Sequence, residues 1–305
     1  MKVKKLALND TIGILCPSSA AEVTSERVIA MQNILNSWGY HLKFAPSCYA
    51  SDGYLAGSDE LRKKDLEDMF LDPNIKAIIC LKGGYGASRI VDKIDYNIIH
   101  NNPKLFMGFS DITVLLNNFY THAKLPTVHG QVGTFIGSPK QDSFSLNDLK
   151  LLLTTNTKGR VLFKQALTLN EGEQEGVLVG GNLSIITNLV GTKYDIDFKE
   201  KIVFIEEVNE APYRVDRMLS QLRLAGKLQE ANGFVLGHFT DCDDKKCIRT
   251  IDYLLEEFFK PLKKPTIMHF ASGHEFPFIN LPIGLKVNLN ASKQTITILE
   301  ELYES

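Results

Sequence analysis

The sequence has 305 residues, of which 44% are hydrophobic and 23% charged, and its net charge is −2 at pH 7. This length allows two domains or one large one, and the composition is typical of a globular protein. Because the charge is nearly balanced and no apolar run approaches the length of a membrane span, we expect neither a nucleic-acid partner nor a membrane partner.

The N-terminal half alternates short apolar runs with stretches of helical periodicity, which predicts an α/β fold with a parallel sheet and helices on both faces. One run, 75–81, is apolar throughout, as expected for a strand buried on both sides. The predicted strands are 11–16, 41–44, 75–81 and 105–109, and the predicted helices are 26–38, one that Ser58 caps, 87–94 and 111–122.

The segment from about residue 138 to 175 is rich in polar residues and has a weak apolar pattern. We therefore predict an N-terminal domain over 1–140, a linker over 141–175 and a C-terminal domain over 176–305. The C-terminal half mixes element types: strands at 202–205 and 233–239, a helix from Pro212 to about Gly226, and a hairpin whose turn is 290–293.

Ser110 follows the apolar run 105–109 and precedes a predicted helix. This arrangement places a hydroxyl at the tip of a strand, beside helix N-terminal N–H groups that favour negative charge. Such a serine can act as a nucleophile if a base lies within reach.

A glycine-rich loop, Gly83-Gly84-Tyr85-Gly86, follows the strand at 75–81. It could cradle a phosphate, direct N–H groups at a developing oxyanion, or form only a tight turn. Its spacing differs from the dinucleotide fingerprint, and Lys82 precedes the glycines, which is the wrong order for a P-loop.

Glu206 and Glu207 follow the strand at 202–205, where a carboxylate can orient a histidine, although charged residues at strand ends are common. His274 lies in an irregular, proline-containing stretch and is the first candidate for the base. His129 is its main rival.

Five scattered cysteines, an odd number, are typical of a reducing compartment rather than of a disulfide framework. Cys242 and Cys247, with His238 nearby, are too few for a zinc site, so we expect no metal and no cofactor. The N-terminal Met-Lys-Val-Lys-Lys imitates the start of a signal peptide, but polar residues interrupt the apolar stretch that should follow, and we expect a cytoplasmic protein.

Several segments form a set whose joint order is more specific than any one of them. They are Cys-Pro-Ser-Ser (16–19), Gly-Tyr-Leu-Ala-Gly-Ser-Asp-Glu-Leu-Arg (53–62), Leu-Lys-Gly-Gly-Tyr-Gly-Ala (81–87), Gly-Phe-Ser-Asp-Ile-Thr (108–113), Gly-Gly-Asn-Leu-Ser (180–184), Ile-Glu-Glu-Val-Asn-Glu-Ala-Pro-Tyr-Arg-Val-Asp-Arg-Met-Leu (205–219), Gly-His (273–274) and Asn-Leu-Pro-Ile-Gly (280–284). Together they resemble the LD-carboxypeptidases of serine-peptidase family S66, over nearly the whole chain.

The resemblance implies an N-terminal parallel-sheet domain of flavodoxin or Rossmann type, a C-terminal mixed α/β domain of barrel-like β character, and a site in the cleft between them. It implies a triad in which Ser110 is the nucleophile, Glu206 the carboxylate, with Glu207 as the fallback, and His274 the general base. It further implies oxyanion-hole N–H groups at Gly84 and Asp111, and we expect Gly83 and Tyr85 to contact substrate.

The implied reaction is release of terminal D-alanine from muropeptide tetrapeptides in peptidoglycan recycling, by a serine carboxypeptidase that is a homodimer. Two residues depart from the family pattern and could alter substrate preference: Lys82 stands where many relatives have arginine, and Gln131 stands where proline is usual. By residue type, the substrate carboxylate could be bound by Arg89, Arg214 or Arg217, although surface salt bridges explain such arginines as well.

Two other functions stay open at this stage. One is a microcin-immunity-type serine hydrolase that cleaves peptidyl or aminoacyl nucleotides. The other is a non-catalytic binder of cell-wall peptides, because fold alone does not determine function.

Overall fold

The computed structural model describes residues 1–164, 166–244 and 248–304. The chain divides into two compact units. The N-terminal unit contains Met1–Asn156, to which Asn280–Pro282 and the last residues from Leu302 return; the C-terminal unit contains Thr157–Ile279 and Ile283–Glu301. Among the residues that the structure describes, no helix combines the length and the hydrophobicity needed to cross a membrane.

The N-terminal unit is built on a six-stranded sheet in the order β12-β5-β4-β3-β1-β2. Neighbours from β2 to β5 pair in parallel, and the order 2-1-3-4-5 is the flavodoxin-like one. The predicted parallel α/β architecture is confirmed. The strands are β1 (Thr11–Leu15), β2 (His41–Phe44), β3 (Ile75–Cys80), β4 (Leu105–Gly108), β5 (Thr127–His129) and β12 (Leu281–Ile283).

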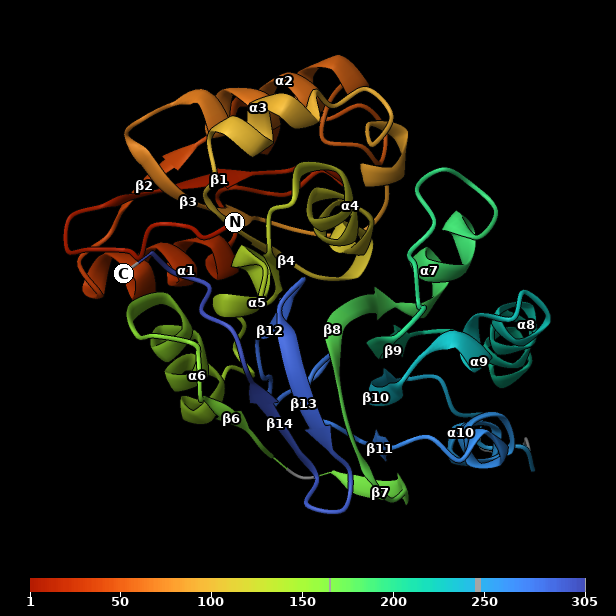
Figure 1. Ribbon diagram of the computed structural model, residues 1–305. Coiled ribbons are helices and arrows are strands. Elements are labelled where there is room, and N and C mark those ends of the chain that lie inside the picture. Colours follow the sequence, from red (N-terminus) through yellow and green to blue (C-terminus); the bar gives the residue numbers. More distant parts are fainter. Residues whose placement is uncertain (165, 245–247, 305) are drawn as a thin grey trace. The chain divides into compact units, whose positions relative to one another are not determined.

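Helices cover both faces of this sheet, with α2 and α3 on one side and α1 and α5 on the other (Figure 1). Ser58 caps α2 as predicted, because its Oγ accepts the N–H of Leu61 at 3.2 Å. The helices are α1 (Glu26–Ser37), α2 (Asp59–Leu71), α3 (Tyr96–Asn101), α4 (Thr113–Ala123), α5 (Gly133–Ile136) and α6 (Ser143–Thr154), with 3-10 turns η1 (Pro46–Tyr49), η2 (Ala87–Arg89) and η3 (Ser110–Ile112).

The helix predicted over 87–94 is wrong. Only η2 is helical there, and α3 begins after it. Gly86 has φ +133°, and the side chain of Asp95 accepts the N–H of Asn97 to start a new helix. A local cap therefore outcompetes the apolar spacing that suggested a longer helix.

The C-terminal unit is a curled eight-stranded sheet in the order β6-β14-β13-β8-β9-β10-β11-β7. Its centre, β8 to β11, is parallel, whereas the flanking strands pair antiparallel, and the predicted hairpin is β13 with β14. The mixed, barrel-like character expected of this half is confirmed. The strands are β6 (Val161–Leu162), β7 (Leu167–Asn170), β8 (Glu173–Asn182), β9 (Lys201–Val208), β10 (Gly233–Thr240), β11 (Thr266–Met268), β13 (Lys286–Asn290) and β14 (Thr295–Ile298).

The helices of the C-terminal unit lie along one side of its parallel strands (Figure 1). Pro212 occupies the first turn of α8, where its missing N–H costs nothing. The helices are α7 (Leu183–Leu189), α8 (Pro212–Leu224), α9 (Lys227–Glu230) and α10 (Ile251–Phe259), followed by the 3-10 turn η4 (Lys260–Leu262).

The segment 141–175, for which the sequence suggests a linker, carries α6, β6, β7 and the start of β8. The side chain of Asp142 caps α6 by accepting the N–H of Ser145 at 3.0 Å, and Leu149, Leu152 and Leu153 are buried. Half of the residues of α6 are apolar, but the polar composition of the rest of the segment concealed this helix.

A buried polar network fixes the returning segment 280–282 to the N-terminal unit. The backbone N–H and the side-chain amide of Asn280 both donate to Asp148 Oδ2, at 2.9 and 2.7 Å. Asn280 Oδ1 accepts the N–H of Gln131 at 3.2 Å, a bond that a proline at this position could not donate. The departure at Gln131 is thus part of this network.

We expect Asn280→Ala to lower the free energy of unfolding by about 1–3 kcal/mol for each buried polar group that loses its partner. Urea unfolding followed by circular dichroism measures this loss. The control is Asn97→Ala at an exposed position of α3. Equal unfolding midpoints for the two variants would contradict a stabilising role of the network.

Candidate active site

Ser110 stands at a sharp bend between β4 and α4. It is half-buried and has φ +65°, in the left-handed region that non-glycine residues rarely adopt. Such a conformation costs about 1–3 kcal/mol and persists where the surroundings enforce it, often at functional sites. The bend presents the hydroxyl at the carboxyl end of a parallel strand, as the sequence predicts for a nucleophile.

The glycine loop after β3 lies directly against this bend. A Cβ added at Gly83 would be 3.0 Å from Ser110 Cβ and 3.3 Å from its Oγ, so any larger residue would crowd Ser110. Gly84 follows with φ +105° and is exposed. Within the described part of the chain, the N–H groups of Gly84 and Asp111 have no protein acceptor, which leaves both able to bind an oxyanion.

The carboxylate of Asp111 joins the bend to the glycine loop. Its Oδ2 accepts the N–H of Ala87 at 2.8 Å, and the residue is almost wholly buried. Burial raises the pKa of Asp111, against the opposing effects of the Ala87 hydrogen bond and the positive charge of Arg62. The side chain of Asp111 is therefore structural, while its backbone N–H is the group predicted to meet substrate.

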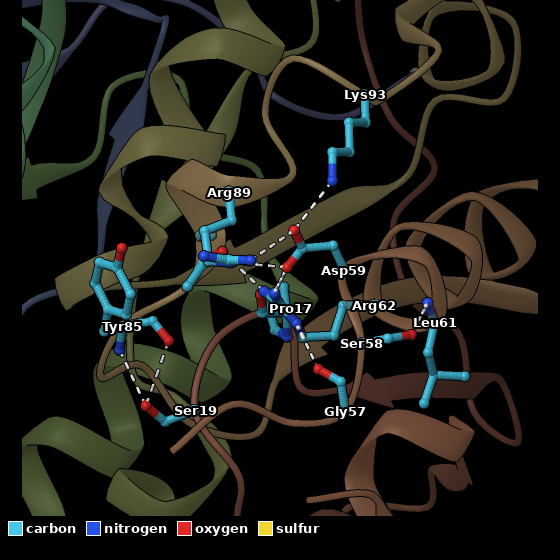
Figure 2. A network of polar contacts seen from close by, with 12 residues as sticks. Pro17, Ser19, Gly57, Ser58, Asp59, Leu61, Arg62, Tyr85, Arg89 and Lys93 are labelled. Atoms are coloured by element: carbon cyan, nitrogen blue, oxygen red, sulfur yellow. Dashed lines mark hydrogen bonds and ion pairs between the residues drawn. The ribbon is translucent and has the colours of Figure 1, made fainter. Parts of the chain in front are cut away.

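Tyr85, predicted to contact substrate, is held at its backbone. Its N–H donates to Ser19 Oγ at 3.0 Å (Figure 2), and its exposed ring lies 5.7 Å from that of Tyr54, which is also exposed. Two adjacent aromatic faces beside the glycine loop are thus open to a ligand.

In the C-terminal unit, Glu206 and His274 form a hydrogen-bonded pair. Glu206 lies on β9 and is wholly buried, and its Oε2 is 2.6 Å from His274 Nδ1. An ionised carboxylate only accepts hydrogen bonds, so Nδ1 carries the hydrogen and Nε2 is left to accept a proton. Gly273, at φ +137°, makes room for the pair, since a Cβ there would be 3.2 Å from Glu206 Oε2.

The pair makes His274 more basic than an ordinary histidine. Burial alone would lower its pKa, but the charge of Glu206 and the hydrogen bond to it outweigh burial, so the pKa of His274 is raised. The ion pair therefore stabilises the folded protein fully at pH values below the pKa of His274 in the unfolded state. This stabilisation is lost as the pH rises through the pKa of His274 in the folded state.

Glu207 points to the opposite side of β9 and has a different task. Its carboxylate accepts the side-chain amide of Asn182 at 2.9 Å and both the N–H and the hydroxyl of Ser184, at 2.8 and 2.6 Å. It therefore holds the N-terminus of α7. The strand alternation separates the two adjacent glutamates, a distinction that the sequence left open.

Three other sequence candidates are engaged in structural contacts. His129, the rival base, is wholly buried on β5 and packs against the ring of Phe109. Lys82 is exposed and donates to the carbonyl of Ala20 at 3.2 Å. Arg89 forms an ion pair with Asp59.

The two arginines of α8 that were candidates for binding the substrate carboxylate also have partners in the protein. Arg214 pairs with Glu210 at 3.3 Å, and the Arg217 guanidinium lies 5.6 Å from the ring centre of Tyr213. No group of three or more histidine, cysteine or acidic side chains suited to a metal occurs among the described residues. Cys242 is buried, and Cys247 lies outside the described residues.

Sequence reasoning missed Ser19 and Arg62, which hold the glycine loop. Arg62 stands three residues after Asp59 on α2, a spacing typical of a surface ion pair. Its presence in the segment 53–62, which carries the family resemblance, is the signal that could have singled it out.

We expect the pKa of His274, followed by NMR through the pH titration of its ring protons, to lie above the ordinary value of 6.5. Glu206→Gln should lower it, because the variant removes the negative charge but keeps the size of the side chain. Glu207→Gln is the matched control and should have the smaller effect. An unchanged His274 pKa in Glu206→Gln would contradict the pairing.

Comparisons with known proteins identify the family to which the chain belongs. Residues 12–130 match the family model described as the LD-carboxypeptidase N-terminal domain, and residues 175–289 match that of its C-terminal domain. A probable murein peptide carboxypeptidase of Bacillus subtilis is 35% identical over 97% of this chain and 94% of its own. The microcin C7 self-immunity protein MccF of Escherichia coli is 25% identical, over 97% and 95%.

A solved structure of similar fold is that of a muramoyltetrapeptide carboxypeptidase from Oxalobacter formigenes. It has a TM-score of 0.83 and 26% identity and covers 97% of this chain and 100% of that one. The family models together span more than half of the sequence. The chain therefore belongs to the LD-carboxypeptidase family, serine-peptidase family S66, and is a serine-type carboxypeptidase by class.

Proposed function

We propose that this protein is an LD-carboxypeptidase that releases terminal D-alanine from muropeptide tetrapeptides, with Ser110 as nucleophile, His274 as general base and Glu206 as the carboxylate that orients it. The observation that carries the proposal is the 2.6 Å contact between His274 Nδ1 and the buried Glu206, which leaves Nε2 as a strong proton acceptor. The strained backbone of Ser110 at the end of a strand supports the same chemistry, as do the N–H groups of Gly84 and Asp111, which have no acceptor among the described residues.

In this mechanism, Ser110 Oγ attacks the carbonyl carbon of the third residue while its proton moves to His274 Nε2. Glu206 stabilises the imidazolium that forms. The N–H groups of Gly84 and Asp111 bind the oxyanion, and each such donor contributes about 3 kcal/mol in the transition state. The C–N bond then breaks, the proton of His274 passes to the amine of D-alanine, and water hydrolyses the acyl-enzyme by the same steps.

The substrate assignment rests on relatives whose names refer to murein peptides. The bond cut joins the L-centre of the third residue to the terminal D-alanine. Gly83 and Tyr85 contact the peptide, since Gly83 lies against Ser110 and the Tyr85 ring is exposed beside it. The cytoplasmic location, the role in peptidoglycan recycling and the homodimer that the family resemblance implies are parts of the same proposal.

A second candidate is hydrolysis of peptidyl or aminoacyl nucleotides. The similarity to a microcin C7 self-immunity protein favours it, and the same Ser-His-Glu chemistry would serve. The two substrates differ in the leaving group, so a direct comparison of the two reactions separates them.

We expect Ser110→Ala to lower kcat for D-alanine release from a defined tetrapeptide by at least about 10⁴-fold, because the nucleophile is lost, while the circular dichroism spectrum stays native. Mass spectrometry of the products measures this release. The wild-type protein is assayed in parallel on an aminoacyl sulfamoyl nucleoside or aminoacyl nucleotide. Full turnover by Ser110→Ala would overturn the serine mechanism.

Two other results would change the assignment of substrate. Faster cleavage of the nucleotide conjugate by the wild-type protein would favour the second candidate. Tight binding of the tetrapeptide without release of D-alanine would identify a non-catalytic binder of cell-wall peptides.

A further inference from the structure

Arg62 is a wholly buried arginine that holds three loops of the N-terminal unit (Figure 2). Its Nη1 donates to the carbonyls of Pro17 and Gly86 at 2.7 and 2.8 Å, and its Nε donates to the carbonyl of Gly57 at 3.3 Å. Its Nη2 bonds to Asp59. The planar guanidinium with its fixed fork of donors can serve all four acceptors at once, which a lysine ammonium could not do in the same geometry.

Two of these loops meet again at the glycine loop. Ser19, which follows the Pro17 carbonyl closely in the chain, accepts the N–H of Tyr85 at 3.0 Å, and its own N–H donates to the Gly83 carbonyl at 3.3 Å. A Cβ at Gly84 would be 2.7 Å from Ser19 Cβ, so the two segments are in tight contact. The orientation of the Gly84 N–H is thus set by contacts that Arg62 fixes at both ends.

The other predicted oxyanion donor is tied to the same network. Ala87, next to the Gly86 carbonyl that Arg62 binds, donates its N–H to Asp111 Oδ2 at 2.8 Å. The backbone of Asp111 and the backbone of Gly84 are therefore connected through one loop, and Arg62 holds that loop from its buried side.

Asp59 provides the negative charge that allows Arg62 to be buried. A buried guanidinium is costly unless it is paired. Asp59 also binds Arg89, at 2.9 and 3.2 Å, and Lys93 at 3.0 Å. The hydrogen bond from Arg89, with help from Lys93 and Arg62, lowers the pKa of Asp59 to about 2, so this carboxylate remains ionised at neutral pH.

We propose that Arg62 is a positioning residue for the reaction, which fixes the Gly84 N–H for the oxyanion through the Pro17 and Gly86 carbonyls, with the partly buried Asp59 as its counter-ion. This inference rests on the proposed function. A purely structural arginine would affect only the stability of the protein. A positioning residue also affects kcat of the protein that is fully folded, and this difference distinguishes the two roles.

The test compares Arg62→Lys with Lys93→Gln in the full chain. Arg62→Lys keeps the positive charge but loses the fork, whereas Lys93→Gln removes an Asp59 ion pair and touches no loop carbonyl. We expect Arg62→Lys to lower kcat for D-alanine release roughly 10- to 100-fold with KM nearly unchanged. In Arg62→Lys we also expect faster amide hydrogen exchange in the peptide that covers residues 81–90. For Lys93→Gln we expect the wild-type kcat and the wild-type exchange rate.

A folded Arg62→Lys with wild-type kcat, or with wild-type exchange over residues 81–90, would overturn the inference. If Arg62→Lys does not fold, Asp59→Asn replaces it, since that variant keeps the carbonyl contacts of Arg62 and removes its counter-ion. Asp59→Asn should lower kcat by less than the roughly 10- to 100-fold expected for Arg62→Lys, and amide exchange over residues 81–90 should be faster than in the wild type. A wild-type kcat together with wild-type exchange would overturn the inference.

Failure of the proposed function is distinguishable from failure of this inference. If the wild-type protein releases no D-alanine, the rate at which a fluorophosphonate labels Ser110 replaces kcat, because labelling also develops charge on an oxygen near the oxyanion donors. Slower labelling of Arg62→Lys, together with faster exchange, supports the positioning role. Equal labelling rates overturn it.

Discussion

A carboxylate with no exposure to solvent requires a partner, and the partner of Glu206 is His274. The short Nδ1–Oε2 contact of 2.6 Å fixes the tautomer of the imidazole and raises its pKa. It is also consistent with glycine at position 273, where φ is +137° and a Cβ would crowd the carboxylate at 3.2 Å. The proposed chemistry depends on this one interaction, because a serine hydroxyl becomes a nucleophile only when a base takes its proton.

The N-terminal unit contributes through a geometric constraint of parallel sheets. The loops after β1, β3 and β4 leave the same edge of the sheet, so Ser19, the glycine loop and Ser110 come together although they are far apart in sequence. Close contact among these loops favours glycine at position 83 and requires it at position 84, where φ is +105°. The buried Arg62 then holds the loops from the inner side, and Asp111 joins the last of them to the glycine loop.

The sequence predicted the architecture well because the apolar runs that form buried strands are long and regular, as at β3. It failed at 87–94, where the cap at Asp95 decides the outcome, and it overlooked α6, whose apolar residues lie within a segment that is otherwise rich in polar ones. For the site, the motifs pointed to Ser110, Glu206 and His274. The choice between Glu206 and Glu207 required the structure, which shows which of the two side chains on β9 contacts His274 and which contacts Asn182. The segment 53–62 contains Arg62, but the burial of its guanidinium and its four contacts depend on the tertiary structure, so its role did not follow from the sequence.

The proposed mechanism requires that Ser110 form an acyl-enzyme with the tripeptide part of the substrate. Acid quenching of the wild-type protein during turnover of a tetrapeptide, followed by proteolysis and mass spectrometry, tests it directly. We expect a peptide containing Ser110 that is heavier by the tripeptidyl group, and no such adduct in Ser110→Ala. An adduct on another residue, or steady release of D-alanine with no adduct under conditions that trap acyl-serines, would contradict it.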